Sequence, residues 1–267
     1  MTDIAGWSAR HGKLVRLDRD VLLADELSCS RAWVIAHSEF ELPADVEARL
    51  EVSAQRLLAG ESLAYIRGWK EFRGLRFGVS PAVLVPRPET ELLVETCLER
   101  AQPGDHILDL GTGSGAIAVS LVHARPDLRL TATDVSSLAV EQARSNARGL
   151  GVNVEFTLGD WFAPFAEQPQ AFDIVVSNPP YIAAGHHALE SLKTEPYQAL
   201  VSGTDGLDAI KHIVTHAPHY VRRWLLVEHG FDQGDAARRL MSEVGFTNVE
   251  TLNDLAGLPR VTCGQRP

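Results

Sequence analysis

Apolar residues recur at helical spacing along the first quarter of the chain. Three segments show this pattern, 20–27, 30–37 and 44–58, and Leu42 and Pro43 separate the last two. Proline suits the first turn of a helix, because its N–H would be unpaired there anyway. Since the segments are short, residues 1–68 are predicted to pack as a small helical domain. It shows no catalytic pattern, and we expect a role in stability or substrate recognition.

The pattern changes between residues 69 and 88. Residues 72–79 alternate between apolar and polar side chains and include turn glycines, which predicts a β-hairpin. Three prolines then stiffen the chain, and Thr90 is a candidate N-cap for the helix that follows. This segment is either only a linker between domains or also a wall of the active site, and the sequence leaves both interpretations open.

Short apolar runs alternate with helical patterns over residues 89–267. The predicted strands are 106–110, 128–133, 152–157, 172–177, 224–228, 247–251 and 260–264, and helices are expected at 116–124, 136–150, 210–220 and 235–244. Strands that alternate with helices predict an α/β fold, a doubly wound and mostly parallel sheet with helices on both faces. The last two strands follow each other directly, so we expect an antiparallel C-terminal strand.

A glycine-rich loop follows the first strand of this domain. It consists of Gly111, Thr112, Gly113, Ser114 and Gly115, and a helix begins directly after it. Glycines allow a tight turn and a close approach of the backbone to a ligand, and a helix N-terminus favours an anionic group. In open α/β sheets, ligands bind outside the carboxyl ends of the strands.

Two further strand ends carry matching side chains. Asp134 ends the second strand, where a carboxylate can accept hydrogen bonds from both ribose hydroxyls, and Trp161 follows the third strand, where its ring can border an adenine. Together with the glycine loop, they predict a site for a cofactor that contains a nucleoside.

The sequence Asn178-Pro179-Pro180-Tyr181 follows the fourth strand. Two prolines cannot continue a strand, because neither has an N–H to donate. The stiff loop presents a side-chain amide, a backbone carbonyl and an aromatic face, which suits a planar NH₂ group. We therefore predict a clamp for such a group, with Asn178, Pro179 and Tyr181 as catalytic residues and Pro180 as a further substrate contact.

Net charge, cysteine content and hydropathy exclude several classes of binding partner. The 267 residues carry a formal charge of −10, which argues against nucleic acid as a stable partner. The three cysteines are far apart and show no disulfide or zinc spacing, so no metal is expected and a reducing, cytoplasmic location is predicted. No apolar run is long enough for a membrane span, and we expect a monomer without a membrane partner.

Two motifs resemble known enzymes. Asp109 followed by the glycine loop is similar to the first motif of class I S-adenosylmethionine-dependent methyltransferases, which have a Rossmann-like fold. Asn-Pro-Pro-Tyr on this fold resembles two groups that methylate a planar, weakly nucleophilic nitrogen. One group is the N6-adenine methyltransferases of DNA and RNA, and the other is the protein glutamine N5-methyltransferases of peptide chain release factors.

The rest of the chain resembles the second group. The matching segments are 64–68, 71–72, 79–91, 195–196, 199–200, 203–207, 228–230, 233–234 and 260–262, and the resemblance is loosest over residues 1–60. It implies methyl transfer from S-adenosylmethionine to the glutamine of the Gly-Gly-Gln motif in class 1 release factors. It also implies that the glycine loop borders the methionine part of the cofactor, Asp134 holds the ribose and Trp161 lies by the adenine. Asn178 would touch both cofactor and glutamine, and the residues up to Tyr181 would hold the glutamine.

Three rival interpretations remain open at this point. An N6-adenine methyltransferase uses the same clamp chemistry, although the acidic charge argues against it. A nicotinamide oxidoreductase explains the glycines and Asp134 but gives Asn178 to Tyr181 no role. A binding protein without activity is expected to have lost the glycines or the clamp, and both are intact. Whether His186, His187 or Glu228 contributes to the site, and which release factor is preferred, does not follow from the sequence.

Overall fold

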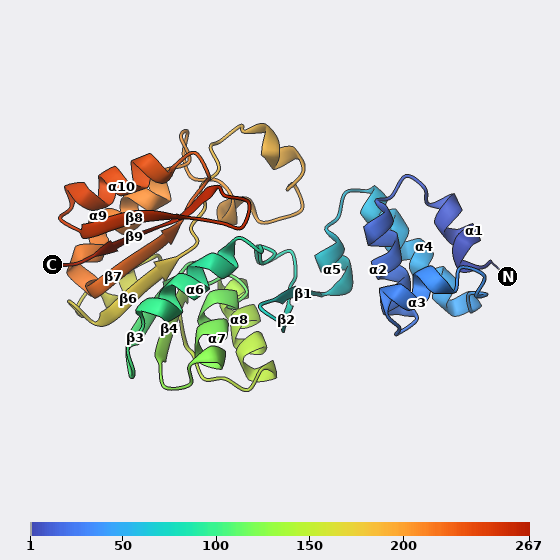
Figure 1. Cartoon of the computed structure of the whole chain (residues 1–267), viewed down its shortest axis with the longest axis horizontal. Helices are drawn as coiled ribbons and strands as arrows, with labels where there is room; N and C mark the ends of the chain where they lie inside the picture. The colour runs from blue at the N-terminus through green and yellow to red at the C-terminus, as the bar shows by residue number, and fades with distance from the viewer. Residues whose placement is uncertain (1) are drawn as a thin grey trace. The chain divides into compact units, whose positions relative to one another are not determined.

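The computed structural model describes residues 2–267. The chain divides into two compact units, one ending at Gly68 and one running from Trp69 to Pro267, and Figure 1 shows both. Each is described by itself. No helix of the described residues is long and apolar enough to cross a membrane.

The first unit is helical. Its helices are α1 (Ile4–Arg10), α2 (Arg16–Glu26), α3 (Arg31–Ala36), α4 (Ala44–Leu58) and α5 (Leu63–Arg67). The side chains of Asp3, Ser30 and Ser62 accept hydrogen bonds from backbone N–H groups at the starts of α1, α3 and α5. The apolar faces meet in one core, in which Trp7 and Leu50 are fully buried. Burial of these faces holds the short helices together, because helices of this length are marginal alone.

The second unit begins with the hairpin β1 (Trp69–Phe72) and β2 (Leu75–Gly78). The elements that follow are α6 (Thr90–Arg100), β3 (His106–Leu110), α7 (Ala116–Ala124), β4 (Arg129–Asp134), α8 (Ser137–Gly149), β5 (Glu155–Leu158), β6 (Phe172–Ser177), α9 (Asp208–Tyr220), β7 (Val221–Glu228), α10 (Gly234–Glu243), β8 (Thr247–Asn253) and β9 (Pro259–Gln265). Short 3₁₀ turns lie at Ala163–Phe165, His187–Glu190 and Tyr197–Ala199.

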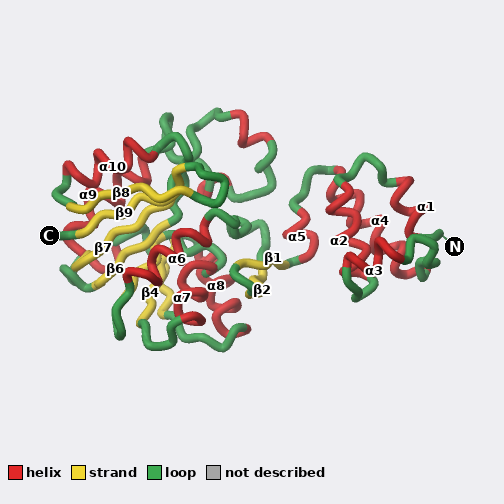
Figure 2. Tube along the Cα trace, viewed as in Figure 1, coloured by secondary structure: helices red, strands yellow, loops and turns green. Residues whose placement is uncertain are grey.

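The sheet has the strand order β5-β4-β3-β6-β7-β9-β8. The strands from β3 to β7 are parallel to one another, and β9 runs antiparallel to both of its neighbours. Helices α6, α7 and α8 cover one face, and α9 and α10 cover the other (Figures 1 and 2). The doubly wound, mostly parallel sheet with an antiparallel C-terminal strand is thus confirmed.

The register aligns the carboxyl ends of the parallel strands. Leu110 pairs with both Thr133 and Ser177, Asp134 pairs with Leu158, and Ser177 pairs with Val227. Continued by one residue, this register puts five residues in one row where the parallel strands end: Leu158, Asp134, Gly111, Asn178 and Glu228. The chain order reverses between β3 and β6, and such a switch point is where open α/β sheets bind ligands.

Asn146 on α8 connects the hairpin to the glycine loop. Its Oδ1 accepts from the Gly78 N–H at 2.8 Å, and its Nδ2 donates to the carbonyls of Gly78 at 2.9 Å and Ser114 at 2.8 Å. Because loops lack regular backbone partners, a buried amide that binds three backbone groups holds them in place.

Two local expectations were wrong. Thr90 is the first residue of α6 rather than its cap, and its hydroxyl accepts a hydrogen bond from Asn178 Nδ2 instead of capping the helix. The third strand of the domain begins at Glu155 and not at Val152, because pairing with β4 starts only there.

We expect Asn146→Ala to lower the free energy of unfolding by about 2–4 kcal/mol, because three buried backbone groups lose their partner. Urea titration of the purified protein measures this. Asn153→Ala is the matched control, since Asn153 is exposed, and a change within about 0.5 kcal/mol is expected. Equal stability of both variants would show that the Asn146 hydrogen bonds contribute nothing to the free energy of unfolding.

Candidate active site

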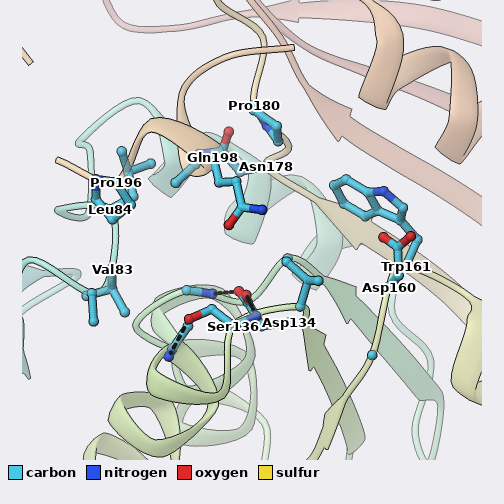
Figure 3. A pocket seen from close by; sticks show the side chains of 17 residues that line it. Val83, Leu84, Asp134, Ser136, Asp160, Trp161, Asn178, Pro180, Pro196 and Gln198 are labelled. Atoms are coloured by element: carbon cyan, nitrogen blue, oxygen red, sulfur yellow. Dashed lines mark hydrogen bonds between the residues drawn. The ribbon is translucent and has the colours of Figure 1, made fainter. Parts of the chain in front are cut away.

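A pocket lies outside the row of strand ends (Figure 3). Its lining includes six of the residues predicted from the sequence to bind cofactor or substrate: Gly111, Gly113, Asp134, Trp161, Asn178 and Pro180. In Figure 3, Asn178 lies between Trp161 on one side and Gln198 on the other, above Asp134. The fold therefore brings Gly111 and Gly113 of the glycine loop, the carboxylate, the indole and the amide to one cavity.

The glycine loop approaches the pocket through its backbone. Gly111 has φ +72°, and a Cβ there would lie 3.5 Å from the Trp161 ring. Gly115 has φ +82°, and a Cβ there would lie 3.1 Å from the Ala143 Cβ. These positions need glycine for conformation and, at Gly115, for close packing of α7 on α8.

Three of the predicted loop residues are not among those that line the pocket. Thr112 is buried and donates its hydroxyl to Asp109 Oδ2 at 2.7 Å. Ser114 is buried, and its carbonyl accepts from Asn146. Gly115 forms the N-cap of α7. These residues shape the loop, which leaves Gly111 and Gly113 to face the pocket.

Asp134 is held by backbone groups on both sides. Its Oδ2 accepts from the Gly113 N–H and its Oδ1 from the Ser136 N–H, both at 2.9 Å. Burial raises the pKa of this carboxyl above its ordinary value, and the two N–H groups counteract that shift. Each carboxylate oxygen has a second lone pair, so the oriented group can still accept hydrogen bonds from a ligand in the pocket.

Trp161 has a left-handed backbone conformation, with φ +44°. Such a conformation is unfavourable for a bulky residue, and residues with strained backbone cluster at functional sites. It places the indole against Gly111 at the pocket wall. The ring thereby offers an apolar face beside the glycine loop.

The Asn-Pro-Pro-Tyr loop lies between two cavities. Asn178 lines the main pocket and also a second, smaller one, in which Pro179 and Tyr181 face Leu84 and Arg87. The Asn178 Nδ2 donates to Thr90 Oγ1 at 3.0 Å, so this amide is fixed at one end.

Tyr181 is anchored at its backbone. Gln233 Nε2 donates to the Tyr181 carbonyl at 3.0 Å, and the same side chain accepts from the Gly230 N–H at 2.8 Å. Burial, followed by the charge of Glu228, raises the pKa of the Tyr181 phenol to about 12. The phenol therefore remains neutral and can donate a hydrogen bond.

The proline-rich segment is a wall of the site as well as a connection. Ala82, Val83 and Leu84 line the main pocket. Glu195 is buried, accepts from the Val85 N–H at 3.1 Å and forms an ion pair with Arg87. This buried carboxylate ties the segment to the loop that contains Pro196, Gln198 and Ala199, which also line the pocket.

The sequence left open whether residues 82–84 belong to a linker or to a wall of the site, and it predicted no role for Glu195, Pro196, Gln198 or Ala199. The signal that was available was the resemblance of segments 79–91, 195–196 and 199–200 to one family, which did not indicate where they lie. Among the described residues, 2–267, no group of three or more histidine, cysteine, aspartate or glutamate side chains is arranged to hold a metal.

The chain matches two models of known protein families. The chain matches the methyltransferase small domain over residues 88–204 and the PrmC N-terminal domain over residues 13–68. A release factor glutamine methyltransferase of Neisseria gonorrhoeae is 45% identical over 257 residues, which cover 95% of this chain and 94% of that protein. One of Vibrio cholerae is 44% identical over 93% of this chain and 89% of its own length.

The chain belongs to the release factor glutamine methyltransferase family. It is an S-adenosylmethionine-dependent methyltransferase. Solved structures agree in fold: a Pyrococcus furiosus methyltransferase has a TM-score of 0.56 at 18% identity, covering 84% of this chain and 99% of its own. A T. thermophilus 16S rRNA methyltransferase, in complex with AdoMet and guanosine, has a TM-score of 0.52 at 18% identity, covering 74% of this chain and 50% of its own.

The residues of the pocket fit S-adenosylmethionine chemically. A backbone loop at a helix start, a carboxylate with spare lone pairs and an indole face are the groups that an amino acid moiety, a ribose and an adenine require. All three come from the ends of β3, β4 and β5. In this methyltransferase, the opposite side of the pocket is left to Asn178 and the proline-rich wall.

We expect Asp134→Ala to raise the dissociation constant for S-adenosylmethionine ten- to hundredfold, because hydrogen bonds to a charged group contribute about 1.5–3 kcal/mol. Isothermal titration calorimetry measures this. Asp127→Ala serves as the control, since Asp127 is an exposed carboxylate before β4 that forms an ion pair with Arg125. An unchanged dissociation constant in Asp134→Ala would contradict the assignment of the ribose site.

Proposed function

We propose that this protein transfers a methyl group from S-adenosylmethionine to the side-chain amide nitrogen, N5, of the glutamine in the Gly-Gly-Gln motif of class 1 peptide chain release factors. The observation that carries the proposal is the Asn-Pro-Pro-Tyr loop, which faces both cavities beside the glycine loop. The names of relatives that match nearly the full chain support the substrate class.

On the cofactor side, Gly111 and Gly113 would border the methionine part, Asp134 would bind the ribose and Trp161 would lie against the adenine. Asn178 lies at the junction with the second cavity. When bound, S-adenosylmethionine supplies an electrophilic methyl group on a sulfonium. The protein then has mainly to position the acceptor.

On the acceptor side, Asn178 Oδ1 and the Pro179 carbonyl would accept the two hydrogens of the glutamine amide. Asn178 Nδ2 is already bonded to Thr90, so Oδ1 is the atom that remains for the substrate. Pro180 restricts the backbone of Pro179 to an extended conformation, which supports the orientation of that carbonyl. Tyr181, which lines the second cavity, would pack against the amide plane.

Positioning is the appropriate kind of catalysis for this acceptor. The lone pair of an amide nitrogen is delocalised into its carbonyl, so the nitrogen is a weak nucleophile. Two acceptors on its hydrogens orient the nitrogen in line with the sulfonium and hold it at near-attack distance, about 3–3.5 Å. The same acceptors stabilise the positive charge that develops on nitrogen, and the proton then leaves to water.

The helical unit of residues 2–68 is proposed to recognise the release factor. It carries its own core and contributes no residue to the lining of either cavity. Such a unit suits contacts with a protein substrate away from the reacting glutamine.

We expect Asn178→Ala to lose nearly all methyl transfer to a release factor while its affinity for S-adenosylmethionine stays within about tenfold, or about 1.4 kcal/mol. The reason is that the substitution removes an acceptor for the reacting amide and leaves the glycine loop and Asp134 in place. Transfer of a radiolabelled methyl group and calorimetry measure the two quantities. Turnover near that of the unmodified protein would rule out the clamp.

The substrate is tested in parallel reactions with a class 1 release factor, the same factor with the Gly-Gly-Gln glutamine replaced, duplex DNA and structured RNA. Mass analysis of the release factor peptide is expected to show one added methyl group on that glutamine. Methylation of adenine in the nucleic acid arms, with none on the release factor, would support the N6-adenine alternative instead.

A further inference from the structure

Glu228 lies beside the clamp at the carboxyl end of the parallel strands. It is the last residue of β7, and its neighbour Val227 pairs with Ser177 of β6. Because the two strands are parallel, Glu228 comes next to Asn178 in the row of strand ends. Glu228 is fully buried and is not among the residues that line either cavity.

The carboxylate of Glu228 is short of hydrogen bonds. Neither of its oxygens accepts a hydrogen bond of ordinary length and angle from residues 2–267. A buried carboxylate without partners costs free energy, so replacement by a neutral side chain of similar size is often neutral or stabilising. A group that destabilises the fold in this position calls for a functional explanation.

Thr90 and the clamp residue Asn178 both interact with the Glu228 carboxyl. Burial raises the pKa of the Glu228 carboxyl to about 7, and interactions with the Thr90 hydroxyl and the Asn178 amide counteract that shift. Thr90 Oγ1 accepts from Asn178 Nδ2 and still has its own proton to donate. A carboxylate can only accept, so the polar groups that face Glu228 must present hydrogens.

This requirement decides which end of the Asn178 side-chain amide, Nδ2 or Oδ1, faces Glu228. The two ends of an asparagine side chain are almost equal in shape, and only their partners decide which end points where. With Nδ2 toward Thr90 and Glu228, Oδ1 is left for the amide hydrogens of the substrate. In the reverse orientation, an NH₂ group would face the NH₂ group of the substrate, and no hydrogen bond would form.

We propose that Glu228 is a positioning residue that acts with Thr90 to hold the Asn178 side chain in the orientation in which its oxygen faces the acceptor nitrogen. The inference rests on the proposed function, because it assigns the orientation of the clamp for an amide substrate. It explains why a fully buried acidic group is placed at this strand end and lines no cavity.

The test uses the full-length protein with S-adenosylmethionine and a release factor. In Glu228→Gln, either end of the new amide can face Thr90 and Asn178, so the preferred orientation is lost. We expect kcat to fall at least tenfold, while KM for the release factor and the dissociation constant for S-adenosylmethionine stay within about threefold. We also expect the melting temperature to stay equal or rise, because a buried charge is removed.

Asp105→Asn is the matched control. Asp105 is a buried carboxylate just before β3, at the opposite end of the parallel strands, and it forms an ion pair with Arg223. Removing its charge is expected to lower the melting temperature and to leave kcat unchanged, since a partner charge loses its counterpart far from the clamp. The two variants thus separate an effect on stability from an effect on the amide.

Substitutions of Thr90 give a second test of the orientation of the Asn178 side chain. Thr90→Val is expected to lower kcat, Thr90→Ser to retain it, and the double variant with Glu228→Gln to be no slower than Glu228→Gln alone. Such non-additive behaviour is the sign that residues act through one interaction.

The pH profile gives a further readout. The charged or titratable groups that face Glu228 are Arg260 from β9, Glu89 before α6 and Tyr181 of the clamp loop. Below pH of about 7, the carboxyl is protonated and can donate to Thr90, which weakens the orientation. We expect kcat of the unmodified protein to rise as the pH passes about 7 and this rise to be absent in Glu228→Gln.

The outcomes separate the two proposals. If the unmodified protein does not methylate the release factor, the proposed function fails. If it does, and Glu228→Gln keeps kcat within twofold with the same pH profile, the positioning role is overturned. A loss of kcat that follows a fall in melting temperature would also overturn it, because that result indicates a structural role only.

Discussion

The pairing register of the parallel strands is the constraint on which the site depends. Backbone hydrogen bonds between β3, β4, β5, β6 and β7 decide which residues stand side by side where the strands end. A slip by one residue would turn every side chain of a strand to the other face. It would separate Asn178 from the glycine loop and from Glu228. The groups of the pocket are therefore assembled by sheet formation before any ligand contributes.

Buried polar side chains fix the loops relative to the strands. Asn146 binds the hairpin and the glycine loop, Gln233 binds the end of the clamp loop, and Glu195 binds the proline-rich wall. Loop backbone has no regular partners, so such side chains supply the hydrogen bonds that secondary structure supplies elsewhere. Glu228 differs from them, because it accepts no hydrogen bond of ordinary length and angle from the described residues. Its burial is thus a cost to the fold beside the clamp.

Local patterns predicted the elements well and their mutual contacts less well. The alternation of apolar runs and helical segments gave the sheet, and the prolines after Ser177 placed a stiff loop at a strand end. Thr90 illustrates the limit. A threonine before an apolar helix is typical of an N-cap, yet its hydroxyl binds Asn178, which is 88 positions away. A local preference that is worth about 1 kcal/mol can be outweighed by a buried long-range hydrogen bond.

The sequence by itself determined the fold class and the loop chemistry, because periodicity, glycine and proline act on the residues next to them, and its motifs indicated the family by resemblance. The tertiary structure decided that residues 82–84 and Glu195 build the wall, that Thr112 and Ser114 turn away from the pocket, and that Glu228 lies beside Asn178. These contacts depend on strand order and register. They join residues that are distant along the chain, and no local pattern encodes which of them will meet.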